Sequence, residues 1–204
     1  MTDTGAMYRD RKDAGRQLGE ALREAGYADA VLLGIPRGGV IVAALAAEVL
    51  GTHAGIIVAR KVGAPGHSEL GIGAVTSDGS AYIDRQLAAD VGAGEDLIEE
   101  RIAREVEEAK RREELYGTVR PEVQGKTVVV VDDGLATGST AIAAARAMRD
   151  RGAEYVVVAV PVGATQSMAL LRRKRTTSSV HWSHNSSTPW GLTTGNSSRS
   201  ATTR

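Results

Sequence analysis

The residues best suited to chemistry lie together near position 132, where two adjacent carboxylates follow an apolar run. The run 127–131 predicts a buried strand that delivers Asp132 and Asp133 to its C-terminal end. A glycine-containing turn follows, and hydroxyl-bearing residues then open an Ala-rich helix. Backbone N–H groups at a helix start bind phosphate well, and nearby carboxylates accept hydrogen bonds from vicinal hydroxyls. The pattern therefore indicates a site for a phosphorylated ribose.

Other interpretations of this stretch fit it less well. It is not a Walker A loop, because Ser139 stands where that motif requires lysine and the glycine spacing differs. A plain strand end and helix cap would not explain the acid pair, since two adjacent ionised carboxylates repel each other. A phosphorelay receiver domain also uses paired acids after a strand. It would need a later lysine at a strand end, and the run 155–160 ends in Pro161 and Val162.

The surrounding sequence alternates between short apolar runs and helical patterns. Runs rich in Val and Ile predict strands at 30–35, 55–59, 71–75, 127–131 and 155–160. Helical patterns occupy 10–25, 40–50 and 139–151, each ending near a glycine. This order predicts an α/β fold with a parallel twisted sheet flanked by helices. The segment 76–83, with Asp78-Gly79 at its centre, predicts a small antiparallel excursion.

A long charged helix is expected at 95–116. Its acids precede bases by four residues, the favourable order, in the pairs Glu100/Arg104, Glu107/Arg111 and Glu108/Arg112. Its apolar residues form one stripe, at Leu97, Ile98, Ile102, Val106 and Ala109. The stripe favours packing of one face on the sheet over a coiled-coil or nucleic-acid role.

Composition bounds the class of protein. A chain of 204 residues with 42% hydrophobic content suits one domain with a sizeable core. The absence of cysteine excludes disulfides, thiolate zinc sites and cysteine nucleophiles, and it is typical of the cytoplasm, where we expect this protein. The N-terminus is too charged for a signal peptide, and no apolar run reaches the roughly 18 residues of a membrane span.

The last thirty residues differ from the rest. Between positions 175 and 204, 15 residues are Ser or Thr, none is acidic, and both tryptophans occur. Such a segment lacks the apolar periodicity needed to bury itself. We therefore expect a domain at 1–174 and an atypical, disordered tail at 175–204.

The stretch 127–140 resembles the phosphoribosyl-diphosphate (PRPP) signature of type I phosphoribosyltransferases, in which apolar residues precede two acids and a phosphate loop ends in Thr-Gly-x-Thr. The chain is most similar to stand-alone bacterial and archaeal members of unassigned acceptor. The matching motifs are Tyr8-Arg-Asp-Arg-Lys-Asp-Ala-Gly, Gly34-Ile-Pro-Arg-Gly-Gly-Val, Arg60-Lys-Val-Gly-Ala-Pro-Gly and Asp132-Asp-Gly-Leu-Ala-Thr-Gly. The resemblance implies the fold of that family and Mg²⁺-dependent transfer of the phosphoribosyl group to a nitrogenous acceptor, with release of pyrophosphate.

The resemblance also implies a role for each matching residue. Asp132 and Asp133 would hold the ribose 2- and 3-hydroxyls and contact Mg²⁺ indirectly, since PRPP itself would hold most of the ion. The 5-phosphate would bind at Ala136, Thr137, Gly138, Ser139 and Thr140. Pyrophosphate would bind at Arg37, Gly38, Gly39, Arg60 and Lys61. Mg²⁺ is the cofactor expected.

Two of these residues, Arg37 and Lys61, would be catalytic, because rupture of the C1–O bond leaves negative charge on the departing pyrophosphate. Mg²⁺ would neutralise most of that charge. Residues 63–69 match the position of the family's mobile loop, whose closure would exclude water. Within it, His67 and Glu69 are interpreted as plain loop residues rather than as an acid or base.

The resemblance does not identify the acceptor. Ala136 stands where the 6-oxopurine enzymes of the family carry an aspartate, which disfavours hypoxanthine and guanine without establishing adenine. The alternative function is a non-catalytic PRPP-sensing regulator, although a sensor has no need of Arg37 and Lys61. Expected partners are PRPP and a small acceptor of the kind used in purine or pyrimidine salvage. No nucleic acid or membrane is expected, and a homodimer is the assembly considered.

A further hypothesis concerns the tail, which we interpret as a frameshifted reading of the gene from about Lys174. When G/C-rich codons are chosen for residues 175–191 and read one base earlier, they can encode an acid-led apolar strand, a Pro-rich turn and an aromatic pair. The family carries such a segment next. On this hypothesis the chain lacks the last strand of the sheet and part of the hood that selects the acceptor.

Overall fold

A parallel sheet forms the centre of the protein. The computed structural model describes residues 9–117, 120–134, 138–160 and 178–179. The sheet has the strand order β2-β1-β6-β7-β8, and its strands are β1 (Val31–Gly34), β2 (Ala54–Ile56), β6 (Thr127–Val131), β7 (Tyr155–Ala159) and β8 (Ser178–Ser179). All four neighbouring pairs run parallel, which confirms the predicted fold class.

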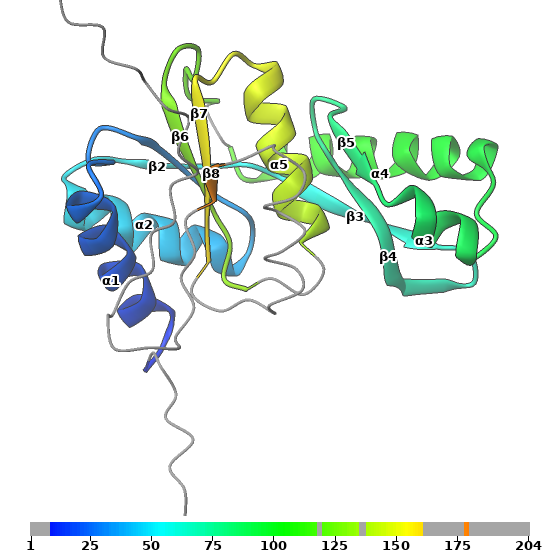
Figure 1. The fold of residues 1–204 in the computed structure, drawn as a ribbon, viewed down its shortest axis with the longest axis horizontal. Helices are drawn as coiled ribbons and strands as arrows, with labels where there is room; N and C mark the ends of the chain where they lie inside the picture. The colour runs from blue at the N-terminus through cyan, green and yellow to red at the C-terminus, as the bar shows by residue number, and fades with distance from the viewer. Residues whose placement is uncertain (1–8, 118–119, 135–137, 161–177, 180–204) are drawn as a thin grey trace, which may run out of the picture.

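Helices cover both faces of this sheet (Figure 1). On one face α1 (Arg11–Glu24) and α2 (Gly38–Leu50) pack on inward residues of alternate register, Leu32, Val129, Val131, Val157 and Ala159. On the other face α5 (Ser139–Asp150) packs on the intervening residues, Leu33, Val128, Val130, Val156 and Val158. Both registers are buried, which explains why these strands are apolar throughout rather than alternating.

A second, smaller sheet forms a separate lobe (Figure 1). It consists of β3 (Ala59–Ala64), β4 (His67–Thr76) and β5 (Ala81–Ile83), all antiparallel, and carries α3 (Arg85–Asp90) and α4 (Glu95–Leu115). Its core contains Val62, Ala64, Ile72, Val75, Ala88 and Ile98. Two strand predictions are wrong in this region. The run 55–59 is not one strand but divides between β2 and β3, and the run 71–75 belongs to this second sheet rather than to the parallel one. Helix α3 was not predicted.

The turn at Asp78-Gly79 is confirmed. Thr76 donates its backbone N–H to the Ser80 carbonyl at 2.9 Å, and Gly79 at the turn has φ of +90°. The Asp78 carboxylate also accepts hydrogen bonds from the Thr76 hydroxyl and the Ser80 N–H. The paired strands extend well beyond the predicted segment 76–83 because β4 is ten residues long.

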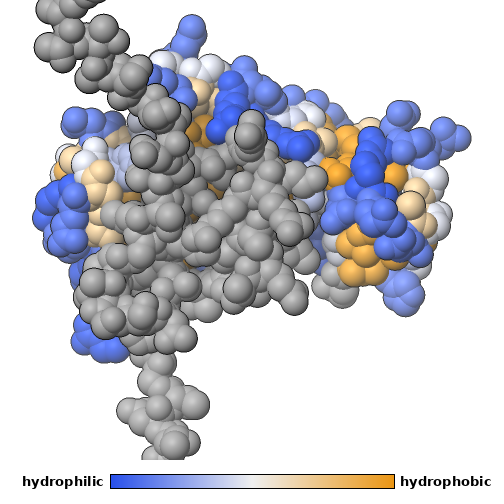
Figure 2. Space-filling model, in the orientation of Figure 1, coloured by the Kyte–Doolittle hydropathy of each residue, from blue (hydrophilic) through white to orange (hydrophobic). Residues whose placement is uncertain are grey.

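Helix α4 packs one face on the lobe, as expected, with Ile98 and Ala109 buried. The predicted Glu108–Arg112 pair forms at 2.8 Å, while Glu107 pairs with Lys110, three residues on, rather than four. Hydrophilic residues cover much of the lobe in Figure 2, with smaller apolar patches between them. Within the described residues, no helix combines the length and apolarity needed to cross a membrane.

Candidate functional site

The site lies where two neighbouring strands end. Strands β1 and β6 pair in parallel up to Gly34 and Val131, so the turn after β1 and the acid pair after β6 emerge side by side. The Ile35 N–H extends this pairing by donating to the Val131 carbonyl at 2.8 Å. Ligands of open α/β sheets bind beyond the carboxyl ends of such strands.

Two glycines allow the turn to lie directly against the acids. A Cβ at Gly38 would overlap the Asp133 carboxylate and lie 2.8 Å from its Cβ. A Cβ at Gly39 would overlap the Val131 carbonyl oxygen and lie 2.9 Å from the Asp132 Cα. The structure therefore brings together the turn predicted for pyrophosphate and the carboxylates predicted for ribose. The peptide bond between Pro36 and Arg37 is cis, and Arg37 is exposed.

The helices that begin at this edge differ from those elsewhere. Helix α2 begins after Arg37 and α5 after Gly138, and neither has a side-chain cap or an acidic residue in its first turn. By contrast, the Asp10 carboxylate caps α1 by accepting two backbone N–H groups at 2.8 Å. Two helix starts with neither a side-chain cap nor an acidic residue in the first turn form a suitable environment for anions.

The predicted phosphate loop is described in part. Gly138 has φ of +78° and precedes α5, Ser139 is buried, and Thr140 is half-buried in the first turn. Ala136 and Thr137 lie outside the described residues.

The two carboxylates have different environments. Asp132 is only 9% exposed, and burial raises the pKa of its carboxyl to about 7. The adjacent Asp133 charge adds to the rise, whereas the Asp133 N–H, which donates to Asp132 Oδ1 at 2.9 Å, opposes it. Asp132 thus carries only part of a negative charge at neutral pH. A cation beside it would favour the charged form.

Asp133 is paired with a residue that the sequence did not single out. Arg11, at the start of α1, donates to Asp133 Oδ2 from Nε at 3.0 Å and from Nη2 at 2.8 Å. Arg11 falls within the motif beginning at Tyr8, which carried the family resemblance but no assigned role. The signal available was an arginine directly after the helix-capping Asp10.

Arg60 and Lys61 lie inside β3, not at the end of a parallel strand as predicted. Arg60 donates to Glu105 of α4 at 2.7 and 3.1 Å, an ion pair within the lobe. Lys61 is exposed, and its aliphatic stem packs beside Gly71. The structure does not bring these two residues to the acid pair.

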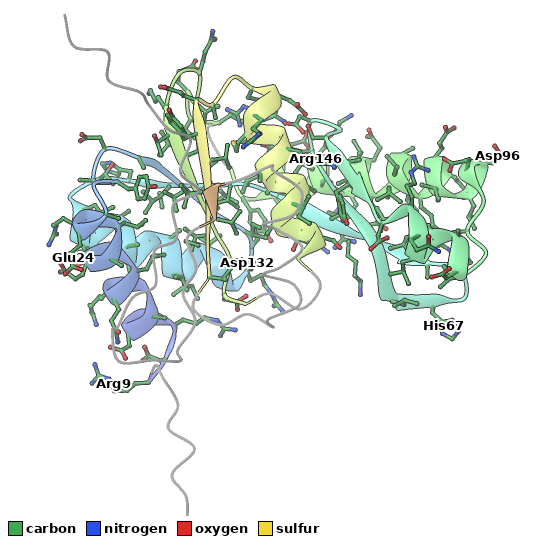
Figure 3. The ribbon with its side chains drawn as sticks, viewed as in Figure 1. Arg9, Glu24, His67, Asp96, Asp132 and Arg146 are labelled. Carbon is green, nitrogen blue, oxygen red and sulfur yellow. The ribbon has the colours of Figure 1, made fainter. Side chains whose placement is uncertain are left out.

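The segment predicted as a mobile loop forms the end of a hairpin. β3 ends at Ala64, β4 begins at His67, and these two residues are paired in register. Figure 3 shows His67 at the outer end of the lobe, far from Asp132 at the parallel sheet. His67 therefore lies away from the acid pair, as expected for a plain hairpin residue.

The two carboxylates fit a magnesium ion that is held mainly by a bound phosphate compound. Oxygen donors are those that Mg²⁺ prefers, and Mg²⁺ in such sites uses one or two carboxylates with phosphate oxygens and water. Within the described residues, no group of three or more His, Cys, Asp or Glu side chains could enclose a metal on its own. Asp132 and Asp133 thus fit a shared site but not a protein-only one.

Comparison with known proteins agrees with this geometry. The model of the phosphoribosyl transferase domain matches residues 5–187. Two proteins from strains of Mycobacterium tuberculosis, named "Putative phosphoribosyl transferase MT0597" and "Putative phosphoribosyl transferase Rv0571c", are each 39% identical over 162 residues. The match covers 77% of this chain and 36% of each relative, so the chain spans about a third of their length.

A solved structure shares the fold. The protein TT1426 from Thermus thermophilus is 37% identical and superposes with a TM-score of 0.71, covering 86% of this chain and 83% of that one. With the acid pair, the glycine turn and the two uncapped helix starts at one sheet edge, these matches show that the chain belongs to the phosphoribosyl transferase domain family.

Proposed function

We propose that this protein is a Mg²⁺-dependent phosphoribosyltransferase that transfers the 5-phosphoribosyl group of PRPP to a nitrogenous acceptor. The observation that carries the proposal is the packing of the Asp132–Asp133 pair against the Gly38–Gly39 turn at the C-terminal edge of β1 and β6. That arrangement combines acceptors for ribose hydroxyls with backbone donors for phosphates.

The positions of the groups support the following binding roles. The carboxylates of Asp132 and Asp133 accept hydrogen bonds from the ribose 2- and 3-hydroxyls. The start of α5, at Gly138, Ser139 and Thr140, binds the 5-phosphate through backbone N–H groups and hydroxyls. The start of α2, at Gly38 and Gly39, receives the pyrophosphate through the backbone N–H groups of its first turn.

The reaction breaks the C1–O bond of PRPP and forms a bond between C1 and an acceptor nitrogen. Pyrophosphate leaves with the electron pair of the C1–O bond, and the acceptor nitrogen loses its proton. When bound, Mg²⁺ would neutralise charge on the pyrophosphate. Arg37, which is exposed at the start of α2, stabilises the same charge.

The acceptor class proposed is a nucleobase or a related small ring nitrogen compound, with a role in purine or pyrimidine salvage in the cytoplasm. Transfer of label from ribose-labelled PRPP across a panel of bases tests this directly. Binding of PRPP without transfer to any base would instead favour a PRPP-sensing regulator.

Calorimetry on Mg²⁺-PRPP tests the site itself. Asp132→Asn with Asp133→Asn should abolish binding while the far-UV circular dichroism stays unchanged. Glu99→Gln with Glu100→Gln, which neutralises two adjacent exposed acids on α4, is the matched control and should bind as wild type does. Undiminished binding by the first double variant would refute the assignment.

A further inference from the structure

The Arg11–Asp133 pair joins two distant parts of the chain at the predicted ribose site. Arg11 is the first residue of α1, and Asp133 lies 122 positions later, just past β6. Both donors of the guanidinium reach the same oxygen, Oδ2, at 3.0 and 2.8 Å. Two charged N–H groups on one oxygen fix the position of that oxygen.

This pair is not what attaches α1 to the protein. Helix α1 is already docked by close packing on α2, where a Cβ at Gly15 would lie 2.6 Å from the Leu45 Cβ. Leu18 and Leu22 of α1 are fully buried in the same core. The ion pair, by contrast, is solvated, with side-chain exposures of 60% for Arg11 and 31% for Asp133. Pairs of that kind add little stability.

The Arg11–Asp133 pair holds a carboxylate that is confined on two sides. The oxygen that Arg11 contacts is the atom that a Cβ at Gly38 would overlap, so the Asp133 carboxylate lies between α1 and the start of α2. The Asp10 cap fixes the first turn of α1 by accepting the Lys12 and Asp13 N–H groups. Arg11 is therefore delivered to Asp133 from a rigid helix start rather than from a loose terminus.

We propose that Arg11 is a positioning residue for PRPP, which holds the Asp133 carboxylate against Gly38 before the ligand arrives. This inference rests on the proposed function, because it assigns Arg11 a role in the same PRPP site. Arg11 acts through Asp133, so it supports the ground state and the transition state alike, and its loss raises KM with little change in kcat.

The test uses the full chain and Mg²⁺-PRPP. Arg11→Gln should weaken binding and raise KM about tenfold, with kcat changed less than threefold. Arg9→Gln is the matched control, since Arg9 carries the same charge two residues away and pairs with Asp13 instead. Figure 3 shows Arg9 at the outer end of α1, and this variant should bind within twofold of wild type. Arg11→Lys, which keeps the charge without the guanidinium, should recover part of the loss.

A double-mutant cycle separates positioning from a general structural effect. In the Asp133→Asn background, Arg11→Gln should change PRPP affinity by less than twofold, because its partner is already altered. Thermal unfolding verifies that each variant is folded. An equal loss in both backgrounds, or wild-type or tighter binding by Arg11→Gln, overturns the positioning role alone. Failure of the folded wild type to bind PRPP overturns the proposed function and this inference with it.

Discussion

Gly38 offers the sharpest test of how the site is built. A Cβ added there would overlap the Asp133 carboxylate, which can rotate, and would lie 2.8 Å from the Asp133 Cβ, which cannot. Gly38→Ala is therefore expected to rotate the carboxylate away and to shift the backbone slightly rather than to unfold the protein. Rotation removes the hydrogen bonds that the carboxylate would accept from ribose. Hydrogen bonds to a charged group contribute about 1.5–3 kcal/mol, so PRPP affinity should fall about 10- to 150-fold.

Stability should fall only slightly in Gly38→Ala, because the close approach to the Asp133 Cβ needs only a small shift. The rotation breaks the exposed Arg11–Asp133 pair, which costs about 0.5–1 kcal/mol, and alanine in a helix gains up to about 1 kcal/mol over glycine. The melting temperature should therefore stay within about 3 °C of wild type.

Gly39→Ala is the matched control for that prediction. Its Cβ would meet backbone, the Val131 carbonyl and the Asp132 Cα, which cannot rotate away. Overpacking of this kind costs about 1–3 kcal/mol, a drop of about 5 °C in melting temperature. Calorimetry with Mg²⁺-PRPP and thermal unfolding measure both quantities. Wild-type PRPP affinity in a folded Gly38→Ala variant would refute the reasoning, since the carboxylate could then leave Gly38 without consequence.

Three further predictions concern the buried acid, the lobe and catalysis. The pKa of Asp132 rises from 3.8 to about 7 on folding, so the folded protein binds more protons than the unfolded chain between these pH values. Without Mg²⁺, the free energy of unfolding should therefore fall by on the order of 3 kcal/mol as pH rises from 4 to 7. Urea unfolding in EDTA measures this, and a slope unchanged by Asp132→Asn would contradict it. Glu105→Gln, which leaves Arg60 without its 2.7 Å partner, should lower stability by about 1–2 kcal/mol while PRPP affinity stays within twofold; a large loss of affinity would show that the pair serves the ligand site. Arg37→Ala should lower kcat about 100-fold and PRPP affinity far less, and equal losses in both would indicate ground-state binding instead.

The parallel sheet could be predicted from the sequence because strands that are buried on both faces are apolar throughout. Runs such as 128–131 are apolar at every position, and both registers prove to be buried. The acid pair and the glycine turn could also be placed together, since both follow strands of one sheet. The second sheet was harder to predict, because a short apolar run such as 71–75 is compatible with a strand of either sheet. Only its pairing with β3 and β5 shows to which sheet it belongs.

What sequence could not predict were contacts between distant segments. Arg11 and Asp133 are separated by 122 positions and Arg60 and Glu105 by 45, and nothing in the local pattern of either residue specifies its partner. Arg60 follows an apolar run, which predicts a strand end facing the ligand. The division of that run between β2 and β3 places it in the lobe instead.

The local features that do mark the site are departures from what stability alone would favour. Asp132 is buried beside another acid, which raises its pKa and destabilises the unliganded fold as pH rises from 4 to 7. Helices α2 and α5 begin with neither a side-chain cap nor an acidic residue in the first turn, whereas α1 and α3 are capped by Asp10 and Asp84, and the uncapped α4 has two acids in its first turn. These features meet at one sheet edge and have opposite electrostatic requirements: the acids need a cation or hydroxyl donors, and the helix starts need anions. A phosphorylated sugar bound with a divalent cation satisfies both requirements at once, and neither phosphate nor a metal ion alone does so.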